Sequence, residues 1–111
     1  MKYIIDPRVK SSIQNELITA QVALSEGNDG KARVAARRVV VAVMQEVFGA
    51  NLGVEFTSSA ALEYLAKTMD FPETVRSAAT RLQGGLRAKI EGNVYSENPI
   101  DDAEIIIRYF S

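Results

Sequence analysis

Residues 30–49 read GKARVAARRVVVAVMQEVFG, which is the most apolar stretch of the chain. From Val39 onward the stretch leaves almost no polar face at helical spacing, a pattern typical of a helix that other elements cover on several sides. The β-branched run at residues 39–41 would also suit a buried strand, but an apolar pattern about 17 residues long with Ala-rich flanks favours a helix. We therefore expect a long central helix here.

Three arginines, Arg33, Arg37 and Arg38, lie in the first two turns of this expected helix. Their aliphatic stems can cover apolar neighbours while the guanidinium groups reach water, or an acid such as Glu26 or a carboxylate near the C-terminus. The alternative is an anion-binding site, because cations in a first turn oppose the helix dipole and an anionic partner removes that cost. We favour the exposed rim for Arg33 and leave both interpretations open for Arg37 and Arg38.

A second basic segment runs from Thr74 to Ile90 and contains no acid. Within it, Arg81 and Arg87 are the candidates that would complete an anion site with the arginines of the central helix. The alternative interpretation is a solvated face whose charges complement the acidic segment over residues 91–104.

Further helix signals lie on either side of the central stretch. An extended arm is expected over residues 1–6, followed by helices that begin at Pro7, near Ala60, at Pro72 and at Pro99. Glycines at residues 27–30 are expected to end the helix before them, and Gly84 and Gly85 are expected to end, kink or loosen the helix that begins at Pro72. The segment after the central helix is expected to be a loop with Leu52 and Val54 tucked inward, and Met69 is expected in the core. Five helices with short connections predict an all-α, five-helix up-and-down bundle.

The composition suits one soluble domain over residues 1–111. The chain has no cysteine, no histidine and a net charge of −1, which excludes thiolate metal sites and removes the usual general base at neutral pH. The segment MKYIIDPRVK lacks the long apolar region of a secretory signal, and the longest apolar run, residues 39–44, is far short of the ~20 residues of a membrane span. We expect a cytoplasmic protein without membrane contact and without a cofactor.

Acidic residues gather at the start of the last expected helix. Asp101 and Asp102 diverge by about 100° around a helix, so the two carboxylates do not face one metal ion. They are better explained as partners of the helix N-terminal dipole. We predict no metal site and no catalytic residue.

The last expected helix has an unusually broad apolar face. Its stripe consists of Ile100, Ala103, Ile107 and Phe110, and it is widened by Ile105, Ile106 and Tyr109. This is more apolar surface than one facing groove covers. We therefore expect a homodimer, or a complex with a partner protein, with Ile105, Ile106 and Tyr109 at the interface.

The phrase GNDGKARVAARRVVVAVM, preceded by a helix ending ITAQVALSEG, resembles the helical hairpin of HEPN domains, the higher eukaryotes and prokaryotes nucleotide-binding group. The ending NPIDDAEIIIRYF is similar to the last helix of small bacterial members of this group. The resemblance spans about residues 7–110 and implies a HEPN-like helical bundle.

Many HEPN proteins are ribonucleases that use an arginine followed four to six residues later by a histidine, assembled across a dimer. Here Arg81 is followed by Arg87, and the chain has no histidine, so the ribonuclease activity is not carried over. Other members serve as partners of minimal nucleotidyltransferases or as ligand-binding and scaffold modules.

The leading hypothesis is therefore a non-catalytic HEPN-like module that acts through dimerisation or a protein partner, with a nucleotide or RNA phosphate as the anion that it would bind. One alternative is a HEPN-type ribonuclease or toxin–antitoxin component that uses arginines and carboxylates. The other is a plain RNA-binding module.

Overall fold

The computed structural model describes residues 5–110, without the side chains of Ala50 and Leu86, and those residues form helices and no strand. The helices are α1 (Pro7–Ser25), α2 (Asp29–Met44), the π-helical segment η1 (Gln45–Gly49), α3 (Ala50–Leu52), α4 (Ser58–Lys67), α5 (Glu73–Gln83), α6 (Leu86–Ile90) and α7 (Pro99–Phe110). The predicted all-α class is confirmed. Most of the predicted N-terminal arm, residues 1–4, lies outside the described residues.

Side-chain caps start the main helices where the sequence predicts them. Asp6 accepts a hydrogen bond from the Arg8 amide at 2.8 Å, and Pro7 occupies the first position of α1. The same bond lowers the pKa of the Asp6 carboxyl below its ordinary value. Thr57 caps α4, and Asn98 caps α7 by accepting from two amides of the first turn. Local side-chain chemistry therefore explains these boundaries.

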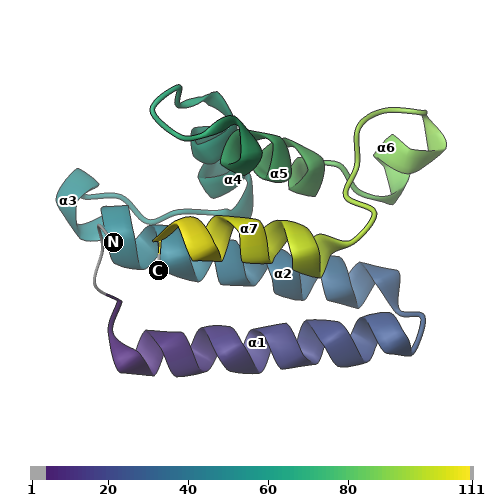
Figure 1. The fold of residues 1–111 in the computed structure, drawn as a ribbon, viewed down its shortest axis with the longest axis horizontal. Helices are drawn as coiled ribbons and strands as arrows, with labels where there is room; N and C mark the ends of the chain where they lie inside the picture. Colours follow the sequence, from purple (N-terminus) through teal and green to yellow (C-terminus); the bar gives the residue numbers. More distant parts are fainter. Residues whose placement is uncertain (1–4, 111) are drawn as a thin grey trace.

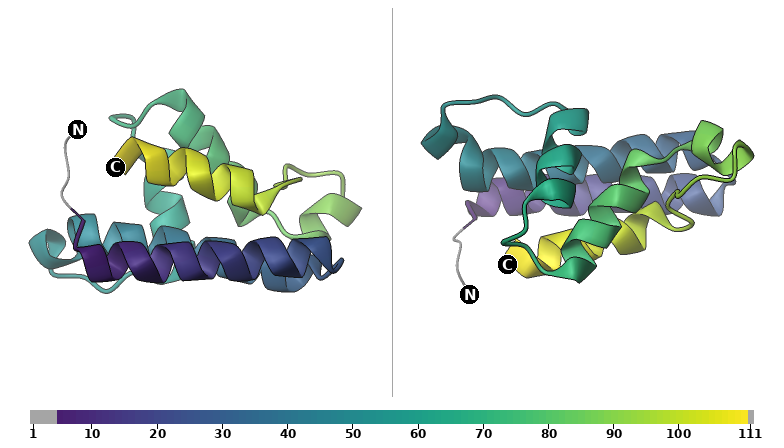
Figure 2. Two further views of the ribbon diagram at one scale, coloured as in Figure 1. Left: turned by 60° about the horizontal axis from the view of Figure 1, so that its bottom comes forward. Right: turned by 90° about the horizontal axis from the view of Figure 1, so that it is seen from above.

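Figure 1 shows how the helices are arranged. The hairpin of α1 and α2 is antiparallel, and α2 also packs against α4 and α7. Helix α7 lies between α2 and α5 and runs in the same direction as α2. Seen from above in Figure 2, α4 runs across α2 rather than alongside it. The predicted up-and-down order is therefore not followed at α4. The short helix α3 forms in a segment that was expected to be a loop, and α6 forms after the two glycines that follow α5.

Gln45 helps to redirect the chain before α4. Its side-chain amide donates to the Val54 carbonyl oxygen at 3.0 Å and accepts from the Phe56 amide at 2.8 Å. These two bonds hold the segment after α3 against η1, so α4 begins beside the end of the central helix and crosses it.

The core is centred on α2, as predicted. Its buried apolar side chains are Ala32, Ala35, Ala36, Val39, Val40, Val43 and Met44. Three predicted core residues are instead on the surface: Met69 is 75% exposed, Leu52 51% and Val54 45%. Met69 lies beyond the end of α4, and Gly53, with φ +65°, turns the segment around Leu52 and Val54 away from the core.

Helix α7 is covered more completely than its sequence suggests. Ile106 and Phe110 are fully buried, and Ile100 is 6% exposed. Ile105 and Ile107 are partly buried and pack against the same core. The broad apolar face is therefore largely satisfied within the chain, because α7 is flanked by α2 on one side and by α5 on the other.

None of the helices within residues 5–110 combines the length and the apolarity needed to cross a membrane.

Candidate functional site

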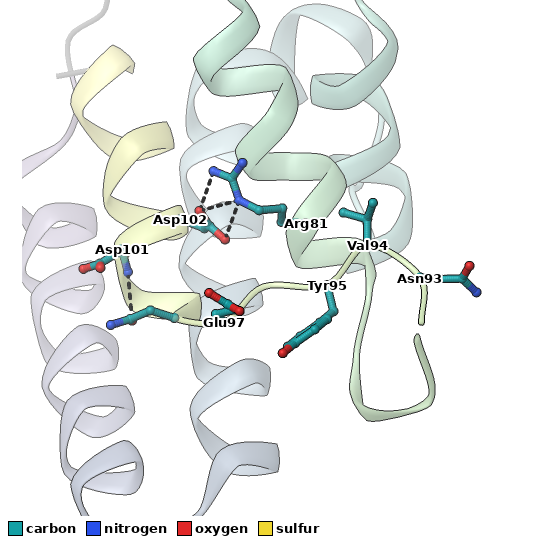
Figure 3. A pocket seen from close by; sticks show the side chains of 8 residues that line it. Arg81, Asn93, Val94, Tyr95, Glu97, Asp101 and Asp102 are labelled. Atoms are coloured by element: carbon teal, nitrogen blue, oxygen red, sulfur yellow. Dashed lines mark hydrogen bonds and ion pairs between the residues drawn. The ribbon is translucent and has the colours of Figure 1, made fainter. Parts of the chain in front are cut away.

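Arg81, at the end of α5, forms a two-point ion pair with Asp102 in the first turn of α7 (Figure 3). The distance from Arg81 Nη2 to Asp102 Oδ1 is 2.7 Å, and that from Nε to the same oxygen is 3.0 Å. Hydrogen bonding to Asp102 raises the pKa of the Arg81 guanidinium above its ordinary value. The Asp102 side chain is 8% exposed and that of Arg81 is 37% exposed, so the pair lies at the edge of the core. Asp102 is thus a tertiary partner of α5, beyond the dipole role predicted for it.

Ser96 completes this network from the loop before α7. It is fully buried, and its hydroxyl donates to Asp102 Oδ2 at 2.5 Å. The same loop passes close to the end of α5, where a Cβ atom at Gly84 would overlap the Val94 carbonyl oxygen. Ser96, Asp102 and Gly84 together hold residues 94–96 against α5.

Arg33 does not form the exposed rim that the sequence favoured. The residue is 7% exposed, and its Nε donates to Asp29 Oδ2 at 2.6 Å, one helical turn earlier. The Arg33 guanidinium also lies 5.7 Å from the centre of the Tyr95 ring, and Lys89 Nζ lies at the same distance from that ring. The loop that carries Tyr95 covers the start of α2, which is why the arginine is buried.

The other predicted anion-binding arginines engage different partners. Arg87, on α6, is exposed and lies 3.3 Å from Glu91. Arg37 is half-buried, and its Nε donates to the Leu82 carbonyl oxygen at 3.0 Å. Burial and, to a smaller extent, the charge of Arg33 lower the pKa of Arg37 from its ordinary value. Arg38 is exposed and makes no ion pair or hydrogen bond with any residue that the structure describes.

Arg81 lines three neighbouring hollows. The first, of about 410 Å³, lies against residues 93–98 and the start of α7 (Figure 3). The second, of about 510 Å³, lies between α4, α5 and Val94, and the third, of about 340 Å³, lies between α5 and Ile105. Glu73 and Ser77 line both the second and the third hollow. We call the face formed by Glu73, Ser77, Thr80, Arg81 and Ile105 the Arg81 surface.

The three predicted interface residues have different surroundings. Ile105 lines a hollow on the Arg81 surface. Ile106 is fully buried inside the chain, so it is not available to a partner in this fold. Tyr109 is half-buried in a group of aromatic rings, 4.9 Å from the Phe110 ring and 5.8 Å from the Phe71 ring.

Among residues 5–110, no three acidic side chains lie together in a way that could hold a metal ion. The Asp102 carboxylate accepts hydrogen bonds from Arg81 and Ser96, while Asp101 is exposed on the neighbouring face of α7.

Sequence reasoning missed the pairing of Arg81 with Asp102. A basic residue at the end of one helix and an acid in the first turn of the next long helix are both common, and each is explained by its own helix dipole. Nothing in the sequence indicated the role of Ser96, because a single serine in a polar loop has no distinguishing pattern.

No family model, no curated protein and no solved structure matches this chain.

Proposed function

We propose that this chain is a non-catalytic, HEPN-like helical module that acts through a protein interface, with a second copy of the chain as its partner. The alternative partner is a nucleotidyltransferase-type protein, the class that the HEPN resemblance implies. The contact face in either case is the Arg81 surface.

One observation carries the proposal: the Arg81 surface is a hollowed face at which a fixed charge and apolar area lie together. Two hollows of about 510 and 340 Å³ adjoin across Ser77, and Ile105 lines the smaller one. Arg81 is held in place by Asp102, so it would lose little side-chain freedom on binding. Interfaces are enriched in arginine, and arginines that are already ordered make stronger contacts.

The arrangement of the charged side chains also favours a non-catalytic role. Arg81 and Arg87, which stand near the spacing of the HEPN ribonuclease motif, are each paired with an acid, Asp102 and Glu91. The sequence offers no histidine or cysteine to act as a base near neutral pH. The proposed assignment to a HEPN-like fold rests on the GNDGKARVAARRVVVAVM phrase and is supported by the antiparallel hairpin that α1 and α2 form.

The experiment is a measurement of mass by light scattering on the purified protein. We expect wild type at micromolar concentration to have twice the 12.2 kDa mass of one chain. Ser77→Arg places a long charged side chain between the two hollows and should yield a monomer that retains its helical circular dichroism.

Ser12→Arg is the matched control, because Ser12 is exposed on α1 and lies outside the Arg81 surface. It should leave the dimer intact. A wild-type protein of 12.2 kDa, or equal disruption by the two substitutions, would contradict the proposed homodimer.

A further inference from the structure

A separate hollow of about 330 Å³ lies between α2, the start of α4 and the end of α5. Its lining residues are Arg37, Ser58, Ser59, Leu62, Glu63 and Gln83. None of these residues belongs to the Arg81 surface. Apart from Leu62 and Glu63, they all present groups that can donate hydrogen bonds.

Arg37 is the side chain around which this hollow is organised. Its Nε is fixed by the Leu82 carbonyl oxygen at 3.0 Å, so the plane of the guanidinium is held. The two Nη groups make no hydrogen bond to any residue that the structure describes. A half-buried arginine fixed through one nitrogen, with its terminal nitrogens unused, presents the paired donors that bind oxyanions.

The charge around Arg37 lacks a counterion. Burial lowers the pKa of Arg37, and the charge of its neighbour Arg33 lowers it further. Asp29 is the acid that pairs with Arg33, through Nε, while Arg33 Nη1 is buried without a hydrogen-bond partner among the described residues. Asp29 pairs with Arg33 and not with Arg37, so an anion beside Arg37 would offset the excess positive charge.

The start of α4, which lines the same hollow as Arg37, adds further hydrogen-bond donors. The hydroxyl groups of Ser58 and Ser59 have no hydrogen-bond partner among the described residues, and the cap of α4 is supplied by Thr57. Helix α4 has no acidic residue in its first turn, so no carboxylate of its own occupies this end. The amides of a first helical turn reinforce anion binding where a basic side chain already faces them.

Glu63 is the one acid in the lining, and it is already paired. Its Oε1 accepts from Lys67 Nζ at 2.9 Å, one turn further along α4. The ion pair directs this carboxylate toward Lys67 and reduces its repulsion of an incoming anion. Gln83 lies on the far side of the hollow. It is exposed, and its side-chain amide has no hydrogen-bond partner among residues 5–110.

From this geometry we propose that the hollow formed by Arg37, Ser58, Ser59 and Gln83 binds a phosphate group, either free or as a monoester. A tetrahedral dianion can accept from the Arg37 fork and from both serine hydroxyls at once. This site goes beyond the proposed interface, and it restricts the predicted anion-binding role to one of the four arginines.

The test is a calorimetric titration of wild-type protein with inorganic phosphate, ribose 5-phosphate and ribose. We expect saturable binding of the two phosphates, no binding of ribose, and weaker binding as salt concentration rises. Equal affinity for the two phosphates identifies a site for the phosphate alone, and tighter ribose 5-phosphate binding identifies an ester site. Both results support the proposal.

Arg37→Gln should weaken phosphate binding by about tenfold or more, the effect of losing one charge-assisted hydrogen bond. Arg38→Gln is the matched control, because it removes the same charge from the adjacent, exposed position, and it should change the affinity by less than about twofold. Arg37 also contacts Leu82, so Ser59→Asp provides a second test: an acid suits a first helical turn but should abolish phosphate binding.

No saturable binding of either phosphate by wild type would overturn the phosphate site. Equal weakening by Arg37→Gln and Arg38→Gln, or unchanged binding by folded Ser59→Asp, would overturn it as well. None of these three outcomes bears on the homodimer, which is measured separately as a mass.

Discussion

At the scale of single residues, Asp102 has the most demanding environment. Its carboxylate is buried, accepts from two nitrogens of Arg81, and accepts from the Ser96 hydroxyl. A buried carboxylate is tolerated only when its oxygens are paired in this way. The network therefore links three segments, α5, the loop over residues 91–98 and α7, through one side chain.

We predict that Asp102→Ala lowers the free energy of unfolding by about 3 kcal/mol. Removing one partner of a buried pair costs roughly 3–5 kcal/mol, and the low end is expected because the Arg81 side chain reaches solvent. The measurement is urea denaturation followed by circular dichroism. Asp101→Ala, at the exposed neighbouring position, should cost less than about 1 kcal/mol. Similar losses for the two variants would show that the ion pair contributes little.

At the scale of elements, the end of α5 shows how tertiary packing can require a particular residue at a helix boundary. Helix α5 ends just before Gly84 and Gly85, where the sequence predicts an end, a kink or a loosening, but the structural reason is different from loss of helix propensity. The loop at Val94 and Tyr95 lies so close to Gly84 that no side chain fits there. The glycine is required by tertiary packing rather than by the turn itself, because its φ of −84° is open to any residue.

We predict opposite effects for two glycine-to-alanine substitutions. Gly84→Ala should destabilise the protein by roughly 1–3 kcal/mol, because the new methyl group overlaps backbone atoms of the adjacent loop. Gly30→Ala, in α2, meets nothing within 4 Å and should stabilise the protein by about 0.4–1 kcal/mol. Thermal unfolding of the two variants and of wild type measures whether each substitution lowers or raises the stability. A stabilising effect of Gly84→Ala would refute the close packing of the loop.

At the scale of the whole molecule, α7 joins the two halves of the fold. It packs on α2 of the first hairpin and on α5 of the second helical pair (Figure 1). This packing buries Ile106 and Phe110. The apolar surface that remains for a partner is consequently smaller than the sequence indicates. It includes part of Ile105, beside Arg81.

We predict that the purified protein does not cleave RNA. General acid–base catalysis contributes about 10²–10⁴-fold to a rate, and no side chain in this sequence has an ordinary pKa near 7. The Arg81 guanidinium is protonated, as every arginine in a protein is, and it is paired with Asp102, so it cannot accept a proton. Incubation with a labelled single-stranded RNA, with a known ribonuclease as positive control, is the measurement. Cleavage by wild type that is absent in Arg81→Ala would contradict the non-catalytic assignment.

The sequence by itself determined the all-α class, the central position of α2, and the starts of α1, α4 and α7, because helical periodicity and capping depend on residues within one or two turns of each other. It did not determine that Arg33 is buried under Tyr95, that Ile106 is enclosed, or that Arg81 and Asp102 form a pair. Those outcomes depend on how helices and loops far apart in the chain pack together. Gln45 illustrates the difference: its position in a helix follows from local pattern, whereas its bonds to Val54 and Phe56 exist only because the chain folds back beside it.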